Sequence, residues 1–260
     1  MRWTGSNVEA IPAIEVIGLT CSYQDYKVLE GVSFKVLEGE IFFIIGAVDV
    51  GKTTLLRNMV GLEIPVQGEV RFNGRSFTRA DSSERYEMLK TFGLSFQGGG
   101  LWTSLTLREN LALPLKEYTQ LPPDEIGRIA DFKLSQVGLA GFENYYPSEI
   151  SGGMKKRAGI ARALALDPVI VFFDAPSAGL DPITARGLDR LILQIRDTFG
   201  TTMVIASHDI DSIVGIADRL ILLDAEARGI IAEGSPSALI AGASNPKVLE
   251  FLTRRTVRST

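Results

Sequence analysis

The feature that most constrains this chain is a glycine-rich turn between an apolar run and a helical pattern. Its eight residues fit the spacing G-x-x-x-x-G-K-[ST], and they are Gly46, Ala47, Val48, Asp49, Val50, Gly51, Lys52 and Thr53. Residues 40–45 are typical of a buried strand, and residues 53–60 have the spacing of a helix. Glycines let the main chain turn sharply and present N–H groups, and the helix start adds positive potential. The sequence therefore predicts a strand, an anion-binding loop and a helix in succession.

The side chains of this loop suit a nucleoside triphosphate with Mg²⁺. Lys52 can reach the β- and γ-phosphates, while the Thr53 hydroxyl can ligate the metal ion. Thr54 follows directly and completes the set of residues that we expect around the phosphates. We therefore expect ATP and Mg²⁺ as cofactors. The alternative is a glycine-rich turn before an ordinary helix.

Two further positions have the residue types that phosphate chemistry needs. An apolar run, residues 169–173, ends at Asp174, so a rigid strand would hold one carboxylate beside Mg²⁺. A second glycine-containing loop stands just before the helical pattern of residues 155–166, and its N–H groups would form another anion site. This second loop consists of Ser151, Gly152 and Gly153. A phosphate loop alone leaves kinases, GTPases and ATPases open, and these positions narrow the choice.

Strand and helix patterns alternate along most of the chain. Runs rich in Val, Ile, Phe and Tyr predict strands over residues 14–23, 28–36, 68–72, 203–206 and 219–223. Between residues 101 and 166 helical patterns replace strand patterns, so we expect a helical insertion there. Strands that alternate with helices predict an α/β fold with a parallel sheet covered by helices.

Composition and charge exclude some classes of function. With a formal net charge of −4, the chain lacks the basic balance of a general nucleic-acid binder. Cys21 is the only cysteine, so an internal disulfide is impossible. We expect no secretory signal, and the longest apolar stretch is too short to span a bilayer. A membrane role would therefore require docking to a partner.

Together with the phosphate loop, several motifs resemble those of the ATP-binding cassette (ABC) family. The Ser151 loop looks like the family's signature loop, and Gln97 looks like its Q-loop glutamine, which implies a contact with the metal ion. Asp181, within the run A-G-L-D-P, resembles the D-loop aspartate. His208, within S-H-D, resembles the switch histidine. Tyr23 stands where the family places an aromatic ring that stacks on adenine.

The resemblance covers about residues 14–235 and implies a P-loop NTPase (RecA-like) core with an antiparallel β subdomain and an inserted α-helical subdomain. We expect an N-terminal arm at residues 1–13, the ABC domain at 14–244 with its helical subdomain at about 98–166, and a C-terminal extension at 245–260. The resemblance also implies a dimer, expected to be a homodimer, that closes head to tail around two ATPs. Each site would combine the phosphate loop of one subunit with the Ser151 loop of the other.

A narrower resemblance concerns what is transported. The run Q-G-G-G-L-W-T-S-L-T-L-R-E-N that starts at Gln97 looks like the Mla/Mce-type lipid-transport ATPases, and so does S-G-G-M-K-K-R-A from Ser151. Those cassettes serve a permease and a substrate-binding partner at the cytoplasmic face of the inner membrane. We therefore expect a permease to dock between Gln97 and Leu105, with Leu101 and Trp102 as apolar anchors. The lipid would be handled by these partners.

Two departures from the family pattern fall on nucleotide chemistry. The family usually has a glutamate directly after the strand-end aspartate, and here that position is Ala175. A methyl group cannot accept a proton from the attacking water, so ATP should bind and close the dimer while hydrolysis is slow. The family also favours Ser-Gly where this chain has Val48-Asp49, and a carboxylate near the phosphates opposes anion binding. Aspartate tolerates left-handed main-chain angles, so we expect the loop to form with reduced affinity.

Less specific interpretations stay open. The residues with a plain alternative are Tyr23 (a strand aromatic), Gln97 (a surface amide), His208 (a structural histidine) and Asp181 (the start of a turn). We expect the basic run at residues 155–157 to be a solvated face and residues 245–260 to be a solvated extension. Two other functions also remain: an ATP-gated clamp that hardly hydrolyses, which Ala175 favours, and a soluble ABC protein acting on ribosomes or DNA, which the acidic balance disfavours.

Overall fold

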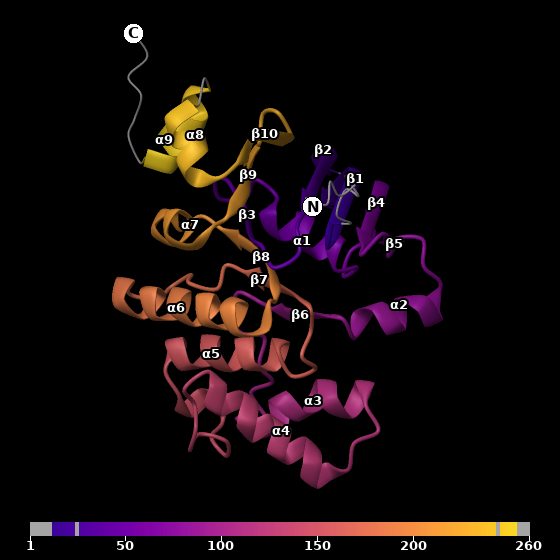
Figure 1. Cartoon of the computed structure of the whole chain (residues 1–260), viewed down its shortest axis with the longest axis vertical. Coiled ribbons are helices and arrows are strands. Elements are labelled where there is room, and N and C mark those ends of the chain that lie inside the picture. Colours follow the sequence, from indigo (N-terminus) through magenta and orange to yellow (C-terminus); the bar gives the residue numbers. More distant parts are fainter. Residues whose placement is uncertain (1–11, 24–25, 243–244, 254–260) are drawn as a thin grey trace, which may run out of the picture.

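The computed structural model describes residues 12–23, 26–242 and 245–253 (Figure 1). Its strands are β1 (Ile14–Tyr23), β2 (Tyr26–Val36), β3 (Ile41–Ile45), β4 (Gln67–Phe72), β5 (Arg75–Ser76), β6 (Phe92–Ser95), β7 (Ile170–Asp174), β8 (Thr202–Ser207), β9 (Arg219–Asp224) and β10 (Gly229–Gly234). Its helices are α1 (Lys52–Met59), α2 (Ser82–Leu89), α3 (Leu107–Tyr118), α4 (Pro123–Gln136), α5 (Gly152–Ala163), α6 (Pro182–Phe199), α7 (Ile210–Ile216), α8 (Pro236–Gly242) and α9 (Pro246–Thr253). Within these ranges no helix is both long and apolar enough to cross a bilayer.

Two sheets form the framework. The larger has the strand order β10-β9-β3-β8-β7-β6. Within it β3 pairs in parallel with β8 and β9, β7 pairs in parallel with β6 and β8, and β10 runs antiparallel to β9. The smaller sheet is antiparallel, with the order β2-β1-β4-β5. The expected P-loop NTPase core with an antiparallel β subdomain is therefore confirmed.

Strand β3 shows why the larger sheet is buried. All five side chains of the strand are buried. Ile41, Phe43 and Ile45 belong to a core that also contains residues of α5 and α6. Phe42 and Ile44 belong to a second core, which contains residues of β1, β2 and α1. Because side chains alternate along a strand, this unbroken apolar run packs on both faces of the sheet.

Helices α3, α4 and α5 form the helical part, and Figure 1 shows α3 and α4 at the end of the molecule opposite α8 and α9. Thr106 and Glu109 close a capping box at the start of α3. The Arg108 guanidinium joins α3 to α4 through hydrogen bonds of 2.6 and 2.9 Å to the Asp131 carboxylate. Helix α5 lies against β6 so closely that a Cβ on Gly93 would be 1.9 Å from the Ala163 carbonyl oxygen. Helix α5 therefore connects the helical part to the larger sheet.

The end of the chain corrects one expectation. Residues 246–253 form α9, in which Val248 and Leu252 are buried. Both belong to the core that contains residues of α5 and α6, which is called the larger core below. Lys247 holds the start of α9 through hydrogen bonds of 2.9 Å to Asp224 and 2.7 Å to Glu226. The expected solvated extension is therefore wrong for α9, because its apolar side chains pack on the core. Of the expected arm at residues 1–13, residues 1–11 lie outside the described residues, as do residues 254–260. Ala13 is buried in the second core, so the arm does not extend that far.

Candidate functional site

Four expected site positions follow the carboxyl ends of neighbouring parallel strands. The phosphate loop begins at Gly46 directly after β3, and His208 directly follows β8. Asp174 ends β7, and Gln97 comes shortly after the end of β6. These strands are adjacent, in the order β3-β8-β7-β6. Because parallel strands end at a common edge, the four positions lie along one edge of the larger sheet, where α/β folds bind ligands.

The shape of the phosphate loop depends on two glycines. Gly46 and Gly51 have φ angles of 150° and 101°, in the region that glycine favours. A Cβ on Gly51 would lie 2.5 Å from Cγ1 of Val28, and one on Gly46 would lie 2.8 Å from the carbonyl oxygen of Leu223. Asp49 has a left-handed φ of 62°, which aspartate tolerates better than most residues. The loop thus forms with Asp49 in place.

Lys52 lies across this loop. Its Nζ donates hydrogen bonds to the main-chain oxygens of Gly46, at 2.9 Å, and Ala47, at 2.6 Å. Burial lowers the pKa of Lys52, and the nearby carboxylates of Asp174 and Asp49 oppose that shift. The ammonium therefore interacts with Asp49, which competes for the cation that a phosphate would use.

Thr53 joins the loop to the end of β7. Its Oγ1 donates a hydrogen bond to Oδ1 of Asp174 at 2.9 Å, and Asp174 is buried. A hydroxyl beside a carboxylate supplies the hard oxygen ligands that Mg²⁺ prefers. With the N–H groups of the loop and the Lys52 ammonium, the residues present fit a triphosphate and its metal ion.

Ala175 follows Asp174 in a strained conformation. Its φ of 44° is left-handed, which is uncommon for any residue with a Cβ. Its N–H donates to the Ala206 oxygen at 2.8 Å, and its own carbonyl oxygen accepts from Lys156 Nζ at 3.3 Å. A cavity of about 260 Å³ is lined by Ala175 and by the exposed His208. His208 and the alanine therefore share a space in which position 175 contributes only a methyl group.

Asp209, to which the sequence alone did not point, anchors the segment that contains His208. Its carboxylate accepts hydrogen bonds from the Ser177 hydroxyl at 3.0 Å and the Ser212 hydroxyl at 3.3 Å. It also caps α7 by accepting from the Asp211 N–H at 3.2 Å. The only signal in the sequence was its place beside His208 at the end of a strand. These contacts link the segment after β7 to the start of α7.

Ser151 and Asp181 both act as helix caps within this chain. Ser151 Oγ accepts from the Met154 N–H at 3.3 Å at the start of α5. Asp181 accepts from the N–H groups of Ile183 and Thr184, each at 3.0 Å, at the start of α6. Hydrogen bonds from Thr184 lower the pKa of Asp181. Ser151, Gly152 and Asp181 are exposed, so their outer surfaces are open to a partner.

Two expectations have different outcomes. The Tyr23 side chain lies outside the described residues, so the expected adenine contact remains a prediction. The expectation that residues 155–157 form a solvated face is wrong for two of them. Lys156 is 8% exposed, and Arg157 donates hydrogen bonds to the carbonyl oxygens of Val137 and Gly187 at 3.0 and 3.5 Å. Neighbouring segments cover both side chains because α5 packs inside the molecule.

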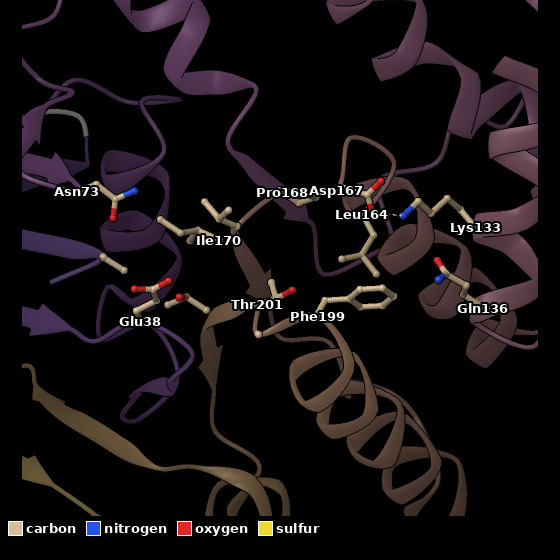
Figure 2. Close-up of a pocket in the computed structure, with 14 residues that line it drawn as sticks. Glu38, Asn73, Lys133, Gln136, Leu164, Asp167, Pro168, Ile170, Phe199 and Thr201 are labelled. Carbon is tan, nitrogen blue, oxygen red and sulfur yellow. Dashed lines mark hydrogen bonds and ion pairs between the residues drawn. The ribbon is translucent and has the colours of Figure 1, made fainter. Parts of the chain in front are cut away.

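A separate cavity of about 520 Å³ lies at the opposite edge of the larger sheet (Figure 2). It borders Ile170 and Thr202, the first residues of β7 and β8. The Lys133 ammonium pairs there with the Asp167 carboxylate, near the ring of Phe199. Asp174 and Ser207 mark the other ends of the same strands, so this cavity is distinct from the phosphate loop.

A phosphate loop on a parallel sheet places the chain among the P-loop nucleotide-binding proteins. A sequence profile of the family described as ABC transporter matches residues 29–178. The chain therefore belongs to the ABC transporter family, as an ATP-binding subunit. The family binds ATP, typically with Mg²⁺, and has ATPase activity.

Individual relatives agree with this assignment. The intermembrane phospholipid transport system ATP-binding protein MlaF of Haemophilus influenzae is 38% identical over 239 residues, which cover 92% of this chain and 89% of the relative. The probable ribonucleotide transport ATP-binding protein mkl of Mycobacterium leprae is 36% identical over 94% of this chain and 70% of the relative. The dimeric post-hydrolysis structure of the ATP-binding cassette MJ0796, bound to ADP and Pi, is 28% identical with a TM-score of 0.76, covering 85% of this chain and 98% of that chain.

Proposed function

We propose that this chain energises lipid transport across a bacterial envelope, as the ATP-binding subunit of a transporter that is driven by closure of a cassette dimer. The likeness to a phospholipid-transport ATP-binding protein over most of both chains supports the substrate class. The observation that carries the nucleotide chemistry is the Thr53–Asp174 hydrogen bond at the end of the phosphate loop. The subunit would work at the cytoplasmic face of the inner membrane, where a permease and its partners handle the lipid.

The nucleotide site would be shared between two subunits. Lys52, Thr53 and Asp174 of one subunit would hold the phosphates and Mg²⁺, with Gln97 as a further metal contact. The exposed Ser151 loop of the second subunit would bind the same nucleotide through the N–H groups at the start of α5. A dimeric solved relative supports this arrangement. A second copy of this chain is the partner that we propose.

Hydrolysis in this chain would be slow. His208 and Asp181 stand where the family has its switch and D-loop residues, but the methyl group of Ala175 cannot accept a proton from water. The carboxylate of Asp209 is engaged by Ser177 and Ser212, so it is already committed to holding the segment that contains His208. ATP binding and ATP turnover would therefore be separated in this chain.

A groove of about 320 Å³ beside the Q-loop supports the permease contact. Its lining includes Leu62 and Trp102, whose side chains are 54% and 62% exposed. Asn110 holds the main chain of Trp102 through hydrogen bonds of 2.7 Å from its N–H and 3.0 Å to its carbonyl oxygen. An exposed indole on a main chain that is held in place is suited to anchor an apolar partner segment. Leu101 instead packs against the larger core, so we propose Trp102 and Leu62 as the anchors.

One experiment separates binding from turnover in the unaltered chain. Isothermal titration should detect binding of ATP with Mg²⁺, while phosphate release stays near the level of the buffer. Lys52→Ala serves as the control that weakens specific binding. Fast phosphate release by the unaltered chain that Lys52→Ala abolishes would contradict slow hydrolysis.

A second experiment tests the partner and the substrate. Tagged chain is purified from membranes of its own host in mild detergent, beside a Trp102→Ser variant. We expect a permease and bound phospholipid with the unaltered chain and loss of the permease with the variant, while both bind ATP. Recovery of a sugar or amino-acid permease would contradict lipid transport. Bound ribonucleotide in place of lipid would favour the activity named for the mycobacterial relative.

An ATP-gated clamp is the second candidate, and Ala175 is the observation that favours it. Such a subunit would close on ATP and regulate its partner without turning over. Both candidates predict a long-lived ATP-bound dimer of the isolated chain, so they differ only when the permease is present. Phosphate release that rises when the permease is added favours a transport subunit, whereas release that stays near the level of the buffer favours the clamp.

A further inference from the structure

Lys156 on α5 joins two segments of the nucleotide site. Its Nζ donates a hydrogen bond to the main-chain oxygen of Gln97, in the loop after β6. The same Nζ donates to the main-chain oxygen of Ala175, directly after β7, at 3.3 Å. Lysines are rarely this buried unless they are paired. Here two carbonyl oxygens, with the Asp174 carboxylate nearby, compensate the buried ammonium.

One face of α5 holds the Q-loop at residues 97–100. Positions 156, 159 and 162 are three residues apart and therefore lie on the same side of the helix. A Cβ on Gly159 would lie 2.7 Å from the Gly99 oxygen, so the loop touches the helix main chain there. Arg162 donates hydrogen bonds to the carbonyl oxygens of Gly99, at 3.4 Å, and Gly100. The loop from Gln97 to Gly100 is thus fixed to α5, and Lys156 is the contact that also reaches Ala175.

The contact at Ala175 bears on the direction of its side chain. A left-handed main chain costs about 1–2 kcal/mol for a residue with a Cβ, so surrounding contacts must hold it. The Ala175 N–H is held by Ala206 and its oxygen by Lys156. Fixing both groups of one residue fixes the direction of its Cβ. Any side chain at position 175 therefore points where these two hydrogen bonds direct it.

We propose that Lys156 is a positioning residue for ATP hydrolysis, which sets the main chain at Gln97 and at position 175 so that both side chains face the reacting phosphate. The proposal rests on the proposed function, because it assigns a role at that same site. Since α5 begins at the Ser151 loop, Lys156 also connects the surface that meets the second subunit to these two positions. Lys156 acts through its neighbours and does not itself exchange a proton with water.

The kinetic test uses the Ala175→Glu background, in which we expect measurable turnover. Adding Lys156→Met should lower kcat by about 10- to 100-fold, as small misplacements of catalytic groups do, and should leave KM for ATP within about twofold. Adding Lys156→Arg should restore most of kcat, because a guanidinium can donate to both carbonyl oxygens. Lys155→Met, at the partly exposed neighbouring lysine, is the matched control. An unchanged kcat in Lys156→Met would overturn the proposal. So would a loss of kcat in Lys156→Arg as large as that in Lys156→Met.

Hydrogen exchange of the 260-residue chain, with Ala175 kept in place, supplies a readout that needs no hydrolysis. Lys156→Met should speed exchange at residues 97–100 and 175–178 and leave residues 46–53 unchanged, while Lys156→Arg restores protection. Unchanged exchange in both segments, or faster exchange throughout the chain, would overturn the positioning role. If Ala175→Glu shows no turnover but exchange changes as expected, the slow-hydrolysis account fails and the positioning of the two segments stands.

Discussion

The phosphate loop and the segment at Ala175 lie at the same sheet edge, but the fold uses them differently. At the loop, the side chains of Lys52 and Thr53 make the hydrogen bonds that hold neighbouring segments together. At Ala175 the main-chain N–H and oxygen make the bonds, and the side chain makes none of those described. Loss of a functional group at position 175 therefore leaves the fold intact, whereas changes in the loop alter shape and binding together. This difference is why we propose that the chain binds ATP but hydrolyses it slowly.

The largest expected effect on binding is at the loop. Lys52→Ala should weaken binding of ATP with Mg²⁺ by about 10- to 100-fold, because a hydrogen bond from a charged donor contributes about 1.5–3 kcal/mol. Isothermal titration measures the change. Lys90→Ala is the matched control. Lys90 lies outside the loop, and its ammonium pairs with the Glu87 carboxylate at 2.7 Å. Equal ATP affinity in Lys52→Ala and Lys90→Ala would show that the phosphate loop does not bind the nucleotide.

Gly51→Ala tests whether the shape of the loop matters beyond its charge. Gly141 also has a left-handed φ, 88°, but a Cβ there would meet nothing within 4 Å, so Gly141→Ala measures main-chain strain alone. We expect about 1–2 kcal/mol of lost stability for Gly141→Ala and more for Gly51→Ala, because the new Cβ also meets Val28. Urea unfolding gives both values. If Gly51→Ala were as stable as Gly141→Ala and bound ATP with unchanged affinity, the shape of the loop at Gly51 would not matter for stability or binding.

Asp49 should weaken binding from within the loop. Asp49→Asn removes its charge and keeps a residue that tolerates φ above zero, so ATP affinity should rise roughly 3- to 10-fold at low salt. The gain should shrink as salt is added, because exposed charges are screened. Titrations at two salt concentrations measure both effects. A gain independent of salt would point to a change of loop shape instead of charge.

The smallest expected effect on binding is at His208, which lines the same cavity as Ala175. His208→Ala in the unaltered chain should change ATP affinity by less than about threefold, since substitutions at exposed positions usually shift free energies by about 0.5 kcal/mol. The same change in the Ala175→Glu background should remove turnover. A large loss of ATP affinity in His208→Ala, with Ala175 kept in place, would mean that His208 and the phosphate loop bind the nucleotide together.

Local patterns were sufficient to predict the part of the fold that carries the loop. The strand, loop and helix around Lys52 follow from neighbouring residues, and the parallel sheet follows from their alternation along the chain. Strand β6 gave no comparable signal, because it is short and contains Gly93, which the close approach of Ala163 requires. Helix α9 looked like a solvated tail because the core that receives Val248 and Leu252 comes from distant segments.

The candidate site divides in the same way. Lys52, Thr53 and Asp174 could be predicted because their spacing and their strand carry the signal. Lys156 could not, since three consecutive basic residues indicate a solvated face until the Q-loop is folded over them. Whether Ser151 and Asp181 serve a second subunit also lies beyond one chain, where both are simply helix caps. Contacts between distant segments decide these roles.

The central claim is that this chain folds and binds ATP but lacks the base that activates water. The most direct test compares phosphate release by the unaltered chain, Ala175→Glu and Ala175→Gln at saturating ATP and Mg²⁺. The two side chains have similar size, but only glutamate can accept the proton. We predict that Ala175→Glu raises the rate by about 10²- to 10⁴-fold and that Ala175→Gln does not. A fast unaltered chain, or a glutamine variant as fast as the glutamate variant, would contradict the account.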